Sequence, residues 1–134
     1  MTQNLILTIN PGTTTMRCGL YERDGAGVKP VREDTIEHDE KVMAGFASIA
    51  DQFDYRAECL SKFLAGTDAG GRLAAVAGRG GMLSPVPAGV IAVNQELVDF
   101  ALHTPRYHHA SNLVAPLAFR MSTAAASPAF IRDP

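Results

Sequence analysis

The N-terminal third of the chain alternates short apolar runs with turn residues, which is the pattern of antiparallel strands. Residues 4–9 and 16–21 are two such runs, and the six residues between them carry turn chemistry, so we expect the runs to pair as a β-hairpin. A second turn at 23–27 leads into a third expected strand, 28–37. Because proline has no backbone N–H to donate, Pro30 should place this third strand at the edge of the sheet.

Residues 40–65 show the clearest helical periodicity in the chain, with apolar side chains at steps of three and four. Asp39 is a suitable N-cap, and Gly66 is a suitable residue just beyond the C-terminus. We therefore expect one continuous helix with an apolar stripe formed by Val42, Phe46, Ile49, Phe53, Ala57, Leu60 and Leu64.

The second half of the chain combines apolar strands with helices. Residues 73–78 are short and apolar throughout, which is typical of a strand in a parallel sheet. A loop rich in glycine and proline follows at 78–89. The remaining expected elements are a short strand at 90–93, a helix capped by Asn94 that ends near His103, a helix at about 110–125 and a last strand within 128–134. Apart from that short strand, the order is β-β-β-α-β-α-α-β, so we expect an α/β domain with a mixed sheet.

Composition narrows the function classes. A chain of 134 residues is the length of one domain, and its net charge of −2 with scattered basic residues argues against a nucleic-acid partner. No apolar run is long enough to cross a membrane and the N-terminus lacks the features of a signal peptide, so we expect a cytoplasmic protein with no membrane partner. Cys18 and Cys59 lack the spacing of a metal site or a disulfide framework, and we expect both to be reduced.

Three expected strands end in residues that can bind a phosphate group. Asn10 and a Gly-Thr-Thr-Thr loop follow the first strand, a Gly-Arg-Gly-Gly loop at 78–81 follows the fourth, and Asp133 lies at the end of the last. Ligands of open α/β sheets bind beyond the carboxyl ends of the strands, so we expect these segments to meet in one cleft.

Each segment suits phosphoryl transfer and also has an ordinary interpretation. Gly12 would let the backbone approach an anion, Arg79 offers a planar and permanently charged fork, and Asp133 could hold Mg²⁺. Taken singly, the segments are better explained as a polar turn, a flexible loop with a solvated arginine and a surface charge, so no one of them is enough to predict a site. The P-loop and dinucleotide-binding patterns are absent, and the four histidines lack the spacing of a zinc site.

Together, these stretches resemble the acetate and butyrate kinases. "LTINPGTTTMRCGLYE" is similar to the opening of that family, in which a first strand leads to Asn-Pro-Gly, hydroxyl residues and a basic residue. "DQFDYRAECLSKFL", "VAGRGGMLSPVPAGVIAVNQELV", "HASNLVAPLAF" and "PAFIRDP" resemble successive blocks of the butyrate kinases in particular, in the same order. The resemblance covers nearly the whole chain. It implies an actin-like, ribonuclease-H-like fold of the acetate and sugar kinase superfamily.

The resemblance also implies a reaction and a set of site residues. A butyrate kinase-like enzyme would use ATP and Mg²⁺ to convert a short-chain carboxylate to an acyl phosphate, with ADP as the other product. The catalytic positions would be Asn10, Arg79, His109 and Asp133, and Asp133 would also hold the metal. The phosphate-binding positions would be Gly12, Thr13, Thr15 and Arg17, and the substrate loop would contain Gly78, Gly80 and Gly81.

Two segments depart from the family's usual pattern. The family more often has Ser-Thr-Ser-Thr-Lys where this chain has Thr-Thr-Thr-Met-Arg at 13–17, and Arg17 keeps the charge of that lysine without its compact geometry. A Gly-Glu pair commonly precedes the "HASN" block, whereas this chain has Tyr107 and His108 there.

The kinases of this family have two domains, and the chain resembles the first. We therefore expect residues 1–134 to be an N-terminal acyl-kinase domain without the second domain, and to be inactive alone. One alternative is a non-catalytic domain that keeps the fold and binds anions or a partner, and another is a kinase of acetate or propionate. A glucokinase-like or chaperone ATPase member of the superfamily is disfavoured because those proteins typically carry an acid where this chain has Asn10. A homo-oligomer is left open.

Overall fold

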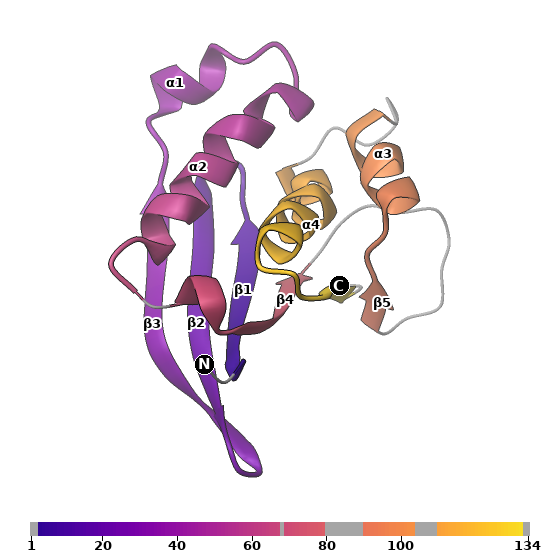
Figure 1. Ribbon diagram of the computed structural model, residues 1–134. Helices are drawn as coiled ribbons and strands as arrows, with labels where there is room; N and C mark the ends of the chain where they lie inside the picture. The colour runs from indigo at the N-terminus through magenta and orange to yellow at the C-terminus, as the bar shows by residue number, and fades with distance from the viewer. Residues whose placement is uncertain (1–2, 68, 80–89, 104–109, 133–134) are drawn as a thin grey trace.

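The computed structural model describes residues 3–67, 69–79, 90–103 and 110–132, which build a six-stranded mixed sheet of order β3-β2-β1-β4-β6-β5 (Figure 1). The expected mixed α/β sheet is therefore confirmed. Its left half in Figure 1 is an antiparallel meander of β1 (Leu5–Pro11), β2 (Thr15–Asp24) and β3 (Gly27–Glu37). In the other half, β4 (Leu73–Arg79) runs parallel to β1 and to β6 (Ala129–Arg132), and β5 (Val90–Ala92) is antiparallel to β6.

The edge position of β3 confirms the expectation from Pro30. Leu20 of β2 pairs with Arg32 and Tyr21 pairs with Pro30, so Val31 is an extra residue that bulges out of the ladder. The proline and the bulge interrupt the free edge, and almost every side chain of β3 is exposed. These features discourage another strand from pairing with this edge.

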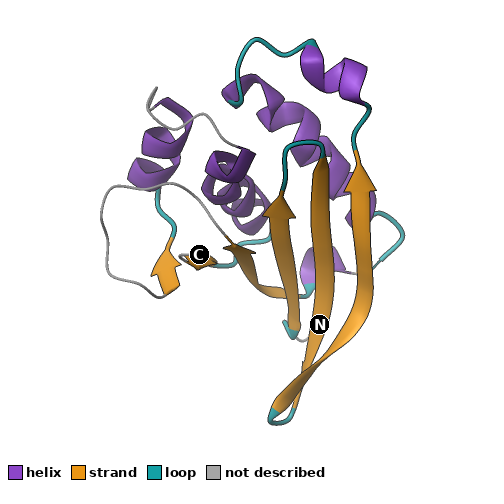
Figure 2. Ribbon diagram, turned by 180° about the vertical axis from the view of Figure 1, so that it is seen from behind, coloured by secondary structure: helices purple, strands orange, loops and turns teal. Residues whose placement is uncertain are grey.

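The described helices gather on one face of the sheet, and Figure 2 looks onto the other face. Helices α2 (Phe53–Leu64) and α4 (Val114–Ala124) pack on the strands, and α3 (Gln95–His103) packs on α4. Short 3₁₀ turns occur at Ala50–Gln52, Ala69–Gly71 and Ala110–Leu113. The expected cap of α3 is confirmed, because the backbone N–H of Leu97 donates to Oδ1 of Asn94 at 2.9 Å.

The prediction of one helix over 40–65 is wrong. The chain instead forms a five-residue helix α1 (Glu40–Ala44), a bend, the 3₁₀ turn at Ala50–Gln52 and then α2. Gly45 ends α1, its N–H reaching back to the carbonyls of Val42 and Met43, because glycine is a poor helix former. The break rotates α1 relative to α2, so that Val42 of the predicted stripe is 44% exposed and Met43 is buried in its place.

The predicted caps of this region nevertheless hold. Asp39 accepts a hydrogen bond from the backbone N–H of Lys41 at 2.8 Å. Gly66 lies just past the end of α2 with φ +83°, a left-handed conformation that favours glycine.

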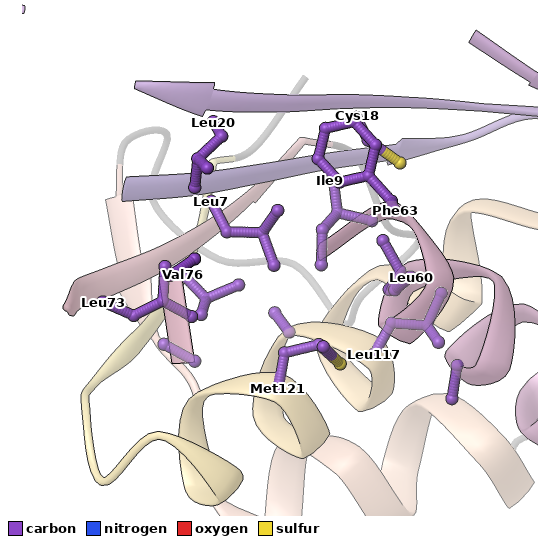
Figure 3. Packing of buried hydrophobic residues seen from close by; sticks show 14 of the residues in the cluster. Leu7, Ile9, Cys18, Leu20, Leu60, Phe63, Leu73, Val76, Leu117 and Met121 are labelled. Atoms are coloured by element: carbon purple, nitrogen blue, oxygen red, sulfur yellow. The ribbon is translucent and has the colours of Figure 1, made fainter. Parts of the chain in front are cut away.

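The core lies between the sheet and the two helices α2 and α4, as Figure 3 shows. Buried side chains alternate along β1 and β2, so one face of each strand is apolar and the other is left for polar residues. The facing side chains labelled in Figure 3 include Leu7, Ile9, Cys18 and Leu20 from the strands, Leu60 and Phe63 from α2, and Leu117 and Met121 from α4.

Candidate functional site

The face of the sheet away from the helices carries a groove of about 730 Å³. Figure 2 looks onto this face. The groove is lined from five neighbouring strands of the described chain, β1, β2, β3, β4 and β6. Two of the site residues predicted from the ends of β1 and β4, Asn10 and Arg79, both line it, together with Arg17 and Gly78. The structure thus brings together four of the predicted site residues.

The strand registers place four polar side chains in one row across the sheet. Asn10 of β1 lies opposite Arg17 of β2. Ile9 pairs with Gly78 in the parallel ladder, so Asn10 and Arg79 follow side by side, and Arg79 pairs with Arg132 of β6. We call Arg17, Asn10, Arg79 and Arg132 the cationic row.

The cationic row presents three guanidinium groups to the groove. All three arginines are exposed, and within residues 3–67, 69–79, 90–103 and 110–132 none of them forms an ion pair or a side-chain hydrogen bond. Free guanidinium groups are suited to bidentate contacts with phosphate or carboxylate. This part of the groove therefore has the chemistry of a site for an anion.

Two carboxylates, Glu33 and Asp34, line the side of the groove formed by β3. Glu33 accepts a hydrogen bond from the hydroxyl of Tyr21 at 2.7 Å, and this bond raises the pKa of Tyr21. No cluster of three or more His, Cys, Asp or Glu side chains that could hold a metal occurs among the described residues. Asp34 pairs with Cys18, whose side chain lies in the core on the helix face of the sheet, whereas Glu33 pairs with Gly19 on the groove face. Since Mg²⁺ is usually held by one or two carboxylates, substrate oxygens and water, Glu33 is the described carboxylate on this face that could contribute to such a site.

The threonine loop between β1 and β2 does not line the groove. Its residues Thr13 and Thr14 line a second hollow of about 400 Å³, together with apolar residues that include Met43 and Ile49. The loop is tightly wound, because the N–H of Gly12 donates to the carbonyl of Thr15 at 2.7 Å. Three predicted phosphate-binding residues, Gly12, Thr13 and Thr15, are thus next to the carboxyl end of β1 but separate from the cationic row.

Gly78 has a packing role that the sequence did not reveal. A Cβ atom at this position would overlap with Cγ1 of Val114, the fully buried first residue of α4. The absence of a side chain therefore allows α4 to approach β4 closely. The backbone of Gly78 still lines the groove on the other face of the sheet.

Sequence reasoning missed two arginines. Arg132 could be found only once β6 was known to lie beside β4, which places it next to Arg79. Arg56 is fully buried and donates hydrogen bonds to the carbonyls of the threonine loop. It did leave a signal, because it falls at helical spacing between Phe53 and Leu60, on the apolar side of α2.

Four of the predicted site residues lie outside the described residues: His109, Asp133, Gly80 and Gly81. Their roles stay predictions. As for membranes, none of the described helices is long and apolar enough to cross one.

The comparisons with known proteins give a relative in sequence and neighbours in structure. No family model matches the chain. A protein named "Probable butyrate kinase" from Coprothermobacter proteolyticus is 40% identical over 131 residues, which cover 96% of this chain and 35% of that protein. The chain therefore spans about a third of the length of this relative.

Solved structures share the fold at low sequence identity. The RuvC protein of T. thermophilus, in complex with a Holliday junction substrate, superposes with a TM-score of 0.55 at 13% identity, over 97% of this chain and 66% of that one. A propionate kinase from Francisella tularensis superposes with a TM-score of 0.52 at 14% identity, over 99% of this chain and 37% of that one. The ribonuclease-H-like, actin-like fold expected from the sequence is confirmed. Taken with the 40% identity along nearly the whole chain, it shows that the chain resembles a part, about a third, of a probable butyrate kinase.

Proposed function

We propose that the protein is an ATP-dependent carboxylate kinase that acts on butyrate, with this chain supplying one wall of the active site. In the reaction, a carboxylate oxygen attacks the γ-phosphorus of ATP, the bond from that phosphorus to the β-phosphate oxygen breaks, and an acyl phosphate and ADP are formed. The identity to a probable butyrate kinase supports the reaction class. Acetate and propionate are the alternative acceptors, because one methylene changes discrimination by only about 1–3 kcal/mol.

The single observation that carries the proposal is the cationic row, whose guanidinium groups are unpaired among the described residues. An acceptor carboxylate and a nucleotide phosphate are both anions, and they repel one another unless the protein neutralises their charge. Positioning and charge neutralisation make up most of what phosphoryl transfer asks of a protein. Arg17 and Arg79 flank Asn10, so they would hold the two anions on either side of an uncharged amide.

Each group of the row has a distinct part in this proposal. Arg79 would bind the transferred phosphoryl group or the acceptor carboxylate as a planar fork. Asn10 can donate a hydrogen bond without repelling an anion, as a carboxylate at that position would. Bound Mg²⁺ would supply further charge neutralisation at the phosphates, with Asp133 as the predicted carboxylate ligand and Glu33 as a described carboxylate on the groove face.

Trapping the acyl phosphate with hydroxylamine tests the activity. The chain is incubated with ATP, Mg²⁺ and butyrate, and hydroxamate is measured by its coloured iron complex. We expect the 134-residue chain alone to form no hydroxamate, since it spans 35% of its relative. A protein that carries these residues together with the rest of the kinase should form hydroxamate.

Two variants of that larger protein decide which residues matter. Arg79→Gln should reduce the rate by at least about 100-fold, because it removes a charge at the reacting groups. Arg23→Gln is the matched control, since Arg23 is an exposed arginine of the same sheet outside the groove. Full activity in Arg79→Gln would show that the cationic row is not the catalytic site.

A non-catalytic domain that keeps the fold and binds anions is the second candidate. It is favoured by one observation: the guanidinium groups of the cationic row, which are unpaired among the described residues, can bind phosphate whether or not a reaction follows. Under this second function the chain would bind phosphate at the cationic row, and the larger protein would form no hydroxamate at all.

A further inference from the structure

Arg56 places a positive charge in the interior, directly behind the threonine loop. Its side chain is 0% exposed, and its Nε donates to Oε1 of Gln52 at 3.0 Å. No carboxylate of the described residues pairs with it. Burial of a charge without an opposite charge is costly, and here it also lowers the pKa of the guanidinium. The hydrogen bonds that Arg56 makes show what this charge does.

Arg56 satisfies the backbone acceptors of the threonine loop from the inside. Its Nη2 donates to two carbonyl oxygens and its Nη1 to a third, at 2.7 Å for Gly12, 3.1 Å for Thr13 and 3.2 Å for Thr15. One guanidinium group therefore holds three backbone carbonyls that lie more than 40 residues away in the sequence.

The fourth carbonyl of the loop is also occupied from the inside. The backbone N–H of His38 donates to the oxygen of Thr14 at 2.8 Å. Burial, and then the charge of Arg56, lower the pKa of His38, which favours the neutral form of its ring. Arg56 is thus the source of positive charge behind the loop.

The loop keeps its donors free. Within the part of the chain that the structure describes, the backbone N–H groups of Thr13 and Thr14 have no acceptor, and none of the three threonine hydroxyls forms a hydrogen bond. With its carbonyls occupied, the loop offers N–H and O–H groups and no free backbone acceptor. Consecutive free N–H groups of this kind bind anions.

We propose that Arg56 is a positioning residue for an anion at the threonine loop. It holds the carbonyls of Gly12, Thr13 and Thr15 inward, so that the amides and hydroxyls of the loop are available to a phosphate group, and its charge lies behind them. Arg56 touches no substrate and acts through the loop. This inference deepens the proposed function and rests on it, because the phosphate would be that of the nucleotide or the acyl phosphate.

Amide hydrogen exchange in the 134-residue chain tests the positioning without any ligand. The reporters are the N–H groups of Gly12 and His38, whose hydrogen bonds close the loop. In Arg56→Gln both should exchange at least about tenfold faster, because hydrogen bonds from a charged donor are lost. Arg56→Lys keeps the charge but cannot reach three carbonyls at once, so its exchange rates should be intermediate.

The matched control is Arg72→Gln. Arg72 is also a partly buried arginine, and its side chain bonds to Asn4 and Glu22. It lies at the other end of β1, where its carbonyl accepts a hydrogen bond from the N–H of Leu5. Its loss should lower the stability of the fold and leave the exchange at Gly12 and His38 unchanged relative to the other strand amides. A role of Arg56 in stability alone would make both variants alike.

Titration with inorganic phosphate tests the consequence for the anion. The shifts of the Thr13 and Thr14 amide resonances give the dissociation constant, which should rise about tenfold in Arg56→Gln, rise less in Arg56→Lys and stay unchanged in Arg72→Gln. If Arg56→Gln does not fold, Arg56→Lys and Gln52→Leu replace it. Gln52→Leu removes the acceptor of the Arg56 Nε–H and keeps the charge of Arg56. Each of these two variants should weaken phosphate binding.

The outcomes separate this inference from the proposed function. If the unaltered chain binds no phosphate at these amides, the threonine loop is not an anion site and this inference is overturned, whereas the anion site of the proposed function is judged separately by the amide shifts of Asn10, Arg17 and Arg79 in the cationic row. If the unaltered chain binds phosphate and Arg56→Gln binds it equally well with unchanged exchange, the positioning role is overturned and the proposed function stands.

Discussion

Replacement of Gly78 by alanine is the most direct test of how α4 sits on the sheet. The added methyl group would overlap with Cγ1 of Val114, which is fully buried between α4 and β4. Well-packed carbon atoms lie about 3.5–4.0 Å apart, so either the Val114 side chain or the helix must move. Overpacking of this kind costs about 1–3 kcal/mol.

Urea unfolding followed by circular dichroism measures this cost. With a urea dependence of about 2 kcal/mol per molar for a small domain, a loss of about 2 kcal/mol lowers the midpoint by about 1 M. Gly27→Ala is the control, because a methyl group at Gly27 meets no atom within 4 Å and the residue has no positive φ. Its midpoint should stay within about 0.25 M of the original, as for a neutral surface change.

A double-mutant cycle then shows whether the loss comes from this one contact. Val114→Ala alone removes two methyl groups from the core and should cost about 1.6 kcal/mol or more. In the double variant the methyl group added by Gly78→Ala occupies part of the vacated space, so the total loss should be at least about 1 kcal/mol smaller than the sum of the single losses. Additive losses, or a Gly78→Ala variant as stable as the original, would refute the close approach of α4 to β4.

Two further predictions concern stability. Burial chiefly raises the pKa of the Cys18 thiol from 9.0 to about 12, so the unfolded state loses this proton first, and the contribution of the thiol to stability is present below pH 9 and declines as the pH rises toward 12. In Cys18→Ala the urea midpoint should therefore fall less steeply above pH 9 than in the unaltered chain. An identical slope would contradict the burial of this thiol. Gly66→Ala forces a Cβ into a left-handed conformation at φ +83° and should cost about 1 kcal/mol in urea unfolding, whereas no loss would show that α2 does not end in this conformation.

Much of the fold follows from local physics of the sequence. The apolar runs and the turns between them give the strands β1 and β2, and the missing N–H of Pro30 gives the edge strand. The break after α1 was missed because the apolar spacing continues through Gly45, although the backbone does not. Periodicity describes side chains and says little about whether a glycine will end a helix.

The site was predictable only where it depends on strand ends. Asn10 and Arg79 could be expected to meet, because parallel strands bring their carboxyl ends to the same edge of a sheet. Arg132 lies next to Arg79 only because β6 pairs with β4. The buried position of Arg56 depends on hydrogen bonds to loop carbonyls that are distant in sequence. Neither can be read from local patterns, since both are products of the tertiary fold.

The central claim is that the cationic row is an anion site, and mapping of phosphate on the folded chain by amide chemical shifts tests it most directly. We predict saturable shifts centred on Asn10, Arg17 and Arg79, with a dissociation constant that rises at least about tenfold in Arg79→Gln and is unchanged in Arg23→Gln. Shifts that are absent from these strands, or that are equally strong in Arg79→Gln, would contradict it.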